Sequence, residues 1–233
     1  MAAEHPDRLR ELIALWWGEA EKYKVLPLDG SMQARLATVR PQTSKPRKRF
    51  VYPGGSVVPS FAAPPVLNRP HSIEADVEVA NGDAAGVLVA QGGDAGGYSL
   101  YLDAGRPRYV YNYLGRERFE LESPHALADG RHVVRYEFEP TGAPDFTTGR
   151  GVPGRGQLYV DGELVANAEF PHTVPFIFEL EGLSCGYDFG APAAEGYEPP
   201  FRFNGTLHSV TFDLSGELIA DDEAELARMM AQQ

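Results

Sequence analysis

The sequence predicts a mostly β protein: an antiparallel two-sheet jelly-roll sandwich preceded by one helix and an irregular linker. Roughly a dozen short apolar or alternating segments lie between residues 71 and 214, each bounded by turn residues. The chain has 25 glycines and 19 prolines, which supply these turns. Asp161-Gly162 separates two such segments and is a strong signal for a two-residue hairpin. Short strands at this spacing are typical of two packed antiparallel sheets.

The chain divides into four predicted parts. They are residues 1–27 with the helix, a basic and Pro/Gly-rich strap over 28–68, the β-sandwich over 69–215, and a tail or short helix over 216–233. The helix is expected over residues 6–24, because apolar side chains recur there with a 3.6-residue period and Pro6 suits a first helical turn. Trp16 and Trp17 give this helix a large apolar surface, which predicts that it packs against a partner or a second copy.

The first strand of the sandwich has the clearest pattern. Apolar residues from Ile73 to Val79 alternate with three acidic residues, which predicts one buried face and one solvated face. The other predicted strands cover residues 86–90, 98–102, 109–114, 118–121, 133–139, 158–160, 163–165, 175–180, 183–187 and 206–214. Longer loops are expected over 141–157 and 188–200, and one short strand is expected in the strap near Val57-Val58.

Charge and cysteine content exclude several classes of function. The formal net charge of −12 argues against a nucleic-acid or membrane partner, since phosphate contacts need Lys and Arg. Six basic residues and no acidic one lie between Ser31 and Phe50, as in a solvated linker. Cys185 is the one cysteine, so no intrachain disulfide or cysteine-ligated zinc site can form. With neither an apolar leader nor a long apolar run, the default expectation is a cytoplasmic protein.

One strand offers a candidate ligand-binding face. Tyr109, Tyr111 and Tyr113 project to the same side of it, because side chains alternate along a strand. Asn112 and Arg116 lie beside them, so the five residues together form a candidate surface for stacking a sugar or an aryl group. Alternating tyrosines are more simply explained by half-buried packing with the hydroxyls at the rim.

No catalytic residue, metal ligand or cofactor site is predicted. The six histidines have no metal-binding spacing. Glu74, Asp76 and Glu78 share one face of a strand, and glycosidase chemistry needs two facing carboxylates. Their spacing is one residue short of the E-x-D-x-x-E pattern of some concanavalin-like hydrolases, so a solvent face is the simpler interpretation and a true hydrolase the weaker one.

Several sequence blocks, in order over about residues 4–215, resemble the C-terminal portion of bacterial arylsulfatases. They are LIALWWGEAEKYKVLPLD, GGSVVPSFAAPPVLNRPHSIEADVEV, GYSLYLDAGRPRYVYNYLG and FNGTLHSVTFDL. The blocks DAGRPRYVYNY, DGRHVVRYEF and LYVDGE are also similar to concanavalin-like and laminin-G-like sandwiches. The formylglycine motif of sulfatases, C/S-x-P/A-x-R, is missing, since Cys185 stands in CGYDF and no serine fits.

The resemblance therefore implies a non-catalytic module that acts as a scaffold or docks on a sulfatase catalytic domain. It implies no catalytic residue in this chain, because none of the family's motif positions is matched. A lectin-like module that binds glycans or sulfated ligands through the tyrosine face is the alternative of a different class.

Overall fold

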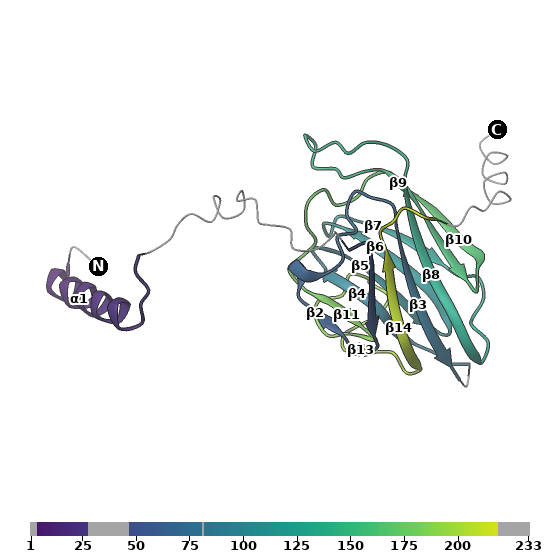
Figure 1. The fold of residues 1–233 in the computed structure, drawn as a ribbon, viewed down its shortest axis with the longest axis horizontal. Coiled ribbons are helices and arrows are strands. Elements are labelled where there is room, and N and C mark those ends of the chain that lie inside the picture. The colour runs from purple at the N-terminus through teal and green to yellow at the C-terminus, as the bar shows by residue number, and fades with distance from the viewer. Residues whose placement is uncertain (1–3, 28–46, 81, 219–233) are drawn as a thin grey trace. The chain divides into compact units, whose positions relative to one another are not determined.

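The computed structural model describes residues 4–27, 47–80 and 82–218. The chain forms two compact units, one up to Pro46 and one from Arg47 onward. The first contains helix α1 (Pro6–Lys22), and the second contains the β-sandwich (Figure 1).

Helix α1 confirms the predicted helix to within two residues at its end. Pro6 begins it, Asp7 lies in its first turn and Lys22 in its last, where each charge suits the helix dipole. The apolar side chains of the helix are exposed apart from Ala20, and the rings of Trp16 and Trp17 meet edge to face at 4.8 Å. No helix in the described ranges is both long and apolar enough to cross a lipid bilayer.

The larger unit consists of two sheets. The first is antiparallel throughout, in the order β1 (Arg49–Pro53), β14 (Thr206–Asp213), β3 (His71–Val79), β8 (Gly130–Pro140), β9 (Gly154–Val160) and β10 (Glu163–Phe170). The second has the order β12 (Tyr187–Asp188), β13 (Phe201–Arg202), β4 (Gly86–Gly93), β5 (Gly96–Asp103), β6 (Arg106–Tyr113) and β7 (Glu117–Glu122). Strand β11 (Leu183–Cys185) pairs with β4 on one side and with β2 (Val57–Val58) on the other. Within the second sheet β13 meets β4 in a single parallel pairing.

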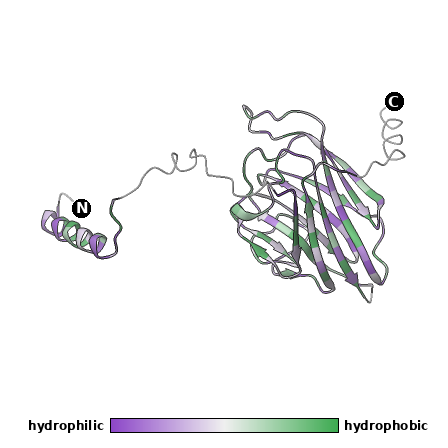
Figure 2. Cartoon of the chain, viewed as in Figure 1, coloured by the Kyte–Doolittle hydropathy of each residue, from purple (hydrophilic) through white to green (hydrophobic). Residues whose placement is uncertain are grey.

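The core lies between the two sheets and confirms the predicted sandwich. Ile73, Ala75 and Val77 of β3 are fully buried, as their alternation predicts. Tyr109 of one sheet stacks on Tyr136 of the other, with ring centroids 3.5 Å apart. Figure 2 shows the matching alternation of hydrophilic and hydrophobic residues along the strands. The inner face of each sheet therefore excludes water, which is the main source of stability in such a fold.

The predicted hairpin at Asp161-Gly162 joins β9 to β10. Both residues have a positive φ, 52° and 86°, as a type I′ turn requires. This turn twists in the same sense as the strands that it connects, so the signal is local and independent of the rest of the fold.

Two predicted segments differ from the structure. Residues 175–180 form no strand; Pro175 and Phe178 are buried there, while Phe176, Ile177 and Leu180 are exposed. Residues 49–53 of the supposedly irregular strap instead form edge strand β1 on β14, because Phe50 and Tyr52 pack against the core. The short strand expected at Val57-Val58 is present as β2. The rest of the strap up to residue 46, and a helix expected over 221–230, lie outside the described residues.

Candidate ligand-binding cleft

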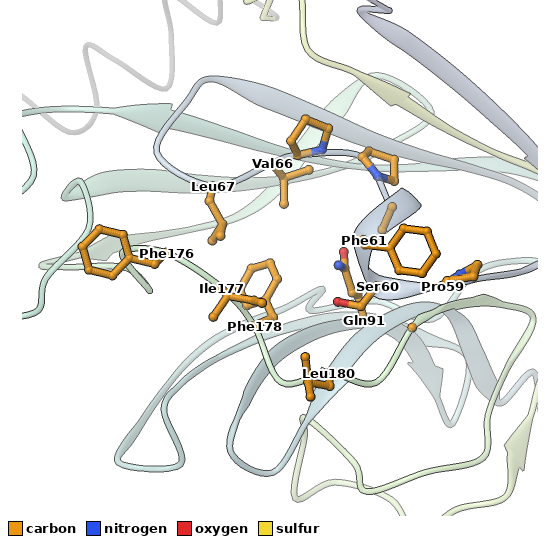
Figure 3. Close-up of a pocket in the computed structure, with 14 residues that line it drawn as sticks. Pro59, Ser60, Phe61, Val66, Leu67, Gln91, Phe176, Ile177, Phe178 and Leu180 are labelled. Atoms are coloured by element: carbon orange, nitrogen blue, oxygen red, sulfur yellow. The ribbon is translucent and has the colours of Figure 1, made fainter. Parts of the chain in front are cut away.

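A cleft of about 440 Å³ opens at the surface of the sandwich between two loop segments, residues 59–67 and 176–182 (Figure 3). Its walls are almost entirely apolar, and their polar side chains are those of Ser60 and Gln91. Apolar walls with a few convergent polar groups are the usual make-up of small-ligand sites.

The first wall follows strand β2. A single 3₁₀ turn, Ser60–Ala62, is closed by the hydrogen bond from Ala62 N to Pro59 O at 2.8 Å. This turn presents Phe61 to solvent with 93% of its surface exposed, although aromatic side chains are normally covered. Val66, at the other end of the wall, is buried and anchors the segment to the core. The backbone that carries the Phe61 ring is therefore held at both ends, by the 3₁₀ turn and by Val66.

The second wall is the segment for which the sequence predicts a strand. Phe178 anchors it in the core, where its ring meets Tyr98 at 5.5 Å and Tyr111 at 5.8 Å. The flanking Phe176 and Leu180 are 68% and 80% exposed. The backbone N–H of Glu179 donates to Gly96 O at 3.0 Å, which holds the segment against β5. One buried anchor with exposed apolar neighbours on both sides gives this wall its shape.

Two further contacts hold the loops around the cleft. Asn68 Nδ2 donates to Pro175 O at 2.6 Å and its Oδ1 accepts from Val152 N at 2.9 Å, so one amide ties the two walls to a third loop. That third loop presents Phe146, whose ring stacks on Phe176 at 5.1 Å. The exposed apolar surface thus continues beyond the cleft itself.

Gln91 of β4 lies at the floor of the cleft (Figure 3). Its side chain is buried, with 6% of the residue exposed. Within the described part of the chain, its one side-chain hydrogen bond is to Tyr98, whose hydroxyl donates to Oε1 at 3.0 Å. In the described residues, Nε2 is not one of the fully buried side-chain atoms that lack a partner, so it reaches the open space of the cleft. Its N–H groups can donate there to water or to a ligand oxygen.

The surroundings of the cleft are acidic. No charged side chain lines it, but Glu179 and Glu181 lie in its second wall segment. Burial raises the pKa of Glu181, and the nearby carboxylates of Asp188, Glu179 and Asp94 raise it further. The hydrogen bond that Glu181 accepts from Ala191 N, at 3.1 Å, opposes this shift. Glu179 likewise accepts a hydrogen bond from Ala95 N, so both carboxylates are held outside the cleft, and the lining supplies no cation to balance an anionic ligand.

The structure places the tyrosines of β6 in the core. Tyr109, Tyr111 and Tyr113 are buried because their side of the strand faces the other sheet, so they form no exposed stacking face. Asn112 is also buried, and its Nδ2 donates to Gly93 O and Asp94 O at 2.8 and 2.9 Å. Of the five predicted residues Arg116 alone is exposed. The tyrosines therefore pack in the core, as the simpler of the two interpretations of their alternation predicts.

Two of these tyrosines still bear on the cleft, because their hydroxyls hold its loops. Tyr111 Oη accepts from Val174 N at 2.8 Å, just before the second wall. Tyr113 Oη donates to Gly149 O at 2.9 Å, in the loop that presents Phe146. The residues that line the cleft were not predicted as a site. The sequence signal that could have indicated them is a phenylalanine next to prolines, in PSFAAPP and in PFIFELEG, where the prolines interrupt the strand pattern.

The acidic side chains of β3 form ion pairs with the neighbouring strand, and Cys185 is buried. Arg131 Nε donates to Asp76 at 2.8 Å, and Arg135 Nη1 donates to Glu74 at 3.3 Å, so both carboxylates form cross-strand ion pairs. Burial raises the pKa of the Cys185 thiol to about 12, which leaves little reactive thiolate. Among residues 4–27, 47–80 and 82–218, no group of three or more His, Cys, Asp or Glu side chains has an arrangement that would hold a metal ion.

His132 and Asp161 lie near Ser123, a set that superficially suggests a catalytic triad. His132 Nδ1 lies 2.7 Å from Asp161 Oδ2, and Nε2 lies 2.8 Å from Ala128 O. Both partners are acceptors, so this geometry favours the doubly protonated ring, whose nitrogens have no lone pair for general-base work. Burial alone would lower the pKa of His132, but the hydrogen bonds to Asp161 and Ala128 raise it above its ordinary value.

This pair predicts a pH-dependent contribution to stability. Asp161→Asn keeps the turn, since Asn suits its positive φ, and removes the charge. Because the folded-state pKa of His132 is raised, the pair's contribution is complete below about pH 6.5 and is lost as the pH rises through the folded pKa. In urea denaturation at pH 5.5, we expect the free energy of unfolding of the wild type to be about 0.5–1 kcal/mol larger than that of D161N. The gap should narrow by pH 9; a gap that is constant with pH would contradict the assignment.

Comparisons with known proteins find only distant structural likenesses. No family model matches the chain, and no curated protein does either. Among solved structures, the CBM40 of a Ruminococcus gnavus IT-sialidase bound to α2,3-sialyllactose is 15% identical over 78% of this chain and 96% of its own, with a TM-score of 0.48. A leech intramolecular trans-sialidase is 12% identical over 76% of this chain and 26% of its own, with a TM-score of 0.48. A SAP-like pentraxin from Limulus polyphemus is 12% identical over 70% and 74%, with a TM-score of 0.40. Such values assign neither a family nor a ligand.

Proposed function

We propose that this protein is a non-catalytic, lectin-like module that binds carbohydrate in the cleft between residues 59–67 and 176–182. The observation that supports it best is the floor of the cleft, where the buried Gln91 amide lies between exposed aromatic walls. Sugars present C–H faces that pack on aromatic rings and oxygens that accept hydrogen bonds. Phe61 and Phe176 offer the rings, and Gln91 Nε2 offers the donor.

Binding without catalysis is favoured by the chemistry near the cleft. Its lining contains no His, Asp, Glu, Lys or Cys side chain that could act as an acid, a base or a strong nucleophile. Ser60 is the one hydroxyl, and no histidine lines the cleft with it. A ligand held there would meet surfaces that pack and donate hydrogen bonds.

The first test is a pair of variants at exposed phenylalanines. Phe61→Ala should weaken the binding of a glycan found on an array by roughly tenfold, since an aromatic contact contributes about 1–1.5 kcal/mol. Phe189→Ala is the matched control, because Phe189 is also exposed but lies outside the cleft lining. Isothermal titration of both variants is the measurement. An array without hits, or equal affinities for F61A and F189A, would rule the proposal out.

The resemblance to the C-terminal portion of arylsulfatases stays a prediction. The observation in its favour is the apolar side of helix α1, where Trp16 and Trp17 are exposed and available to a partner. Docking on a sulfatase catalytic domain, or association with a second copy through this helix, are the two forms of that prediction. Either is compatible with a carbohydrate site in the sandwich, since the cleft is built from the second unit alone.

A further inference from the structure

We infer that the cleft selects neutral sugars that bear an acetamido group and rejects sialylated or sulfated glycans. The inference rests on the proposed function, because it names the ligand class of the same site. Two properties of the cleft support it independently: the absence of a cation from its lining, and the combination of apolar walls with one side-chain amide donor.

Charge argues against anionic sugars. A carboxylate or sulfate that leaves water needs a cation or several N–H donors in its place. The cleft lining has no Lys, Arg or His, and Gln91 is its one buried amide side chain. The carboxylates of Glu179 and Glu181, in the second wall segment, accept hydrogen bonds from Ala95 N and Ala191 N, outside the cleft lining. An anion would therefore lose its water without gaining a cation in return, which lowers its affinity.

The apolar walls argue against a plain neutral hexose. Each hydroxyl buried without a partner costs about 1–3 kcal/mol, and the cleft has few partners to offer. An acetamido group presents one methyl and one carbonyl oxygen instead. The methyl suits the apolar wall of Val66, Leu67 and Phe178, and the carbonyl is an acceptor for Gln91 Nε2. One apolar contact and one buried hydrogen bond match what the cleft provides.

The Tyr98 hydroxyl fixes the direction of the Gln91 amide. It donates to Oε1 at 3.0 Å, which leaves the N–H groups as the open side of the amide. Tyr98 is itself fully buried and packs edge to face against Phe178 of the second wall. The site is therefore set to donate a hydrogen bond, and an acceptor without negative charge is its natural complement.

Three saccharides separate the effect of the acetamido group from the effect of charge. N,N′-diacetylchitobiose, called chitobiose below, is neutral and acetylated. Cellobiose is neutral without acetamido groups, and 3′-sialyllactose has an acetamido group together with a carboxylate. With the full chain, we expect chitobiose to bind in the millimolar range by isothermal titration, the other two at least tenfold more weakly, and chitobiose binding to be independent of added salt.

Two variants test the two properties separately. Gln91→Met keeps the length of the side chain and removes the donor, so chitobiose affinity should fall about tenfold; a thermal melt checks that the variant folds. Leu180→Lys places a cation on an exposed rim position and should improve sialyllactose binding with little effect on chitobiose. Because Leu180 is 80% exposed, this second variant should fold normally.

The outcomes distinguish the inference from the proposed function. If 3′-sialyllactose or cellobiose binds the wild type as well as chitobiose does, and Phe61→Ala weakens it, the inferred ligand class is wrong while a carbohydrate site remains. If chitobiose binds but Gln91→Met leaves its affinity unchanged, the assigned donor is wrong, and with it the reason for the acetamido group. If none of the three binds and a glycan array is blank, both conclusions fall.

Discussion

Gly86→Ala is expected to lower the free energy of unfolding by about 4 kcal/mol, a large fraction of the stability of an ordinary domain. Gly86 is the first residue of β4, next to the point where β4 pairs with β13, and its φ is +121°. An added Cβ would collide with Phe203 Cα and Arg202 O, which are backbone atoms and cannot rotate away. The variant must either shift β13 or strain the strand, so urea denaturation should show a large drop in the midpoint.

Gly130→Ala separates the two causes of that loss. Gly130 has a similar φ of +130°, but a Cβ there meets no atom within 4 Å. This variant carries only the backbone strain, about 1–2 kcal/mol. The difference between the two variants therefore measures the collision with β13. Equal losses for G86A and G130A would show that β13 moves freely on β4.

The second large effect is a loss of stability in mild acid that is due to His71. Its ring is buried against Phe138, at 5.5 Å, and Nδ1 donates to Arg69 O at 3.0 Å. Burial lowers the pKa of His71 to about 4, with the backbone bond to Arg69 O opposing the shift. Unfolded, the same side chain titrates near 6.5. The unfolded state thus binds a proton in the range where the folded state does not.

The sign of the effect follows from this difference. Above about pH 6.5 both states are neutral and the contribution of His71 to stability is complete. Between pH 6.5 and 4 the unfolded state is progressively favoured, by about 3 kcal/mol in total, and below pH 4 the slope from this group ends.

The control for this effect is His71→Phe, which keeps an aromatic ring and cannot be protonated. It should cost about 1 kcal/mol at pH 7.5 for the lost hydrogen bond, and should become the more stable protein near pH 4.5. Urea denaturation of both proteins across pH 4–8 is the measurement. If the free energies of unfolding of wild type and H71F change with pH in parallel, the pKa of His71 is not lowered in the folded state.

Parts of this fold could be predicted because the signal is local. The alternation of apolar and acidic residues in β3, the Asp161-Gly162 turn and the stripe of α1 each follow from side-chain geometry within a few residues. The edge strand β1 was missed because its proline and basic neighbours hide the two aromatic residues that it buries.

Local periodicity is enough to predict a two-sheet sandwich and a Trp-rich helix, because it dictates which side chains share a face. What each face meets depends on the packing of the whole chain. The partner sheet buries the tyrosines of β6, whereas Phe61 and Phe176 are exposed although their sequence context is apolar. The cleft exists because two loops far apart in the chain are anchored by Val66 and Phe178 on either side of Gln91. A pattern within one segment holds no information about such distant neighbours, so the tertiary structure alone reveals the site.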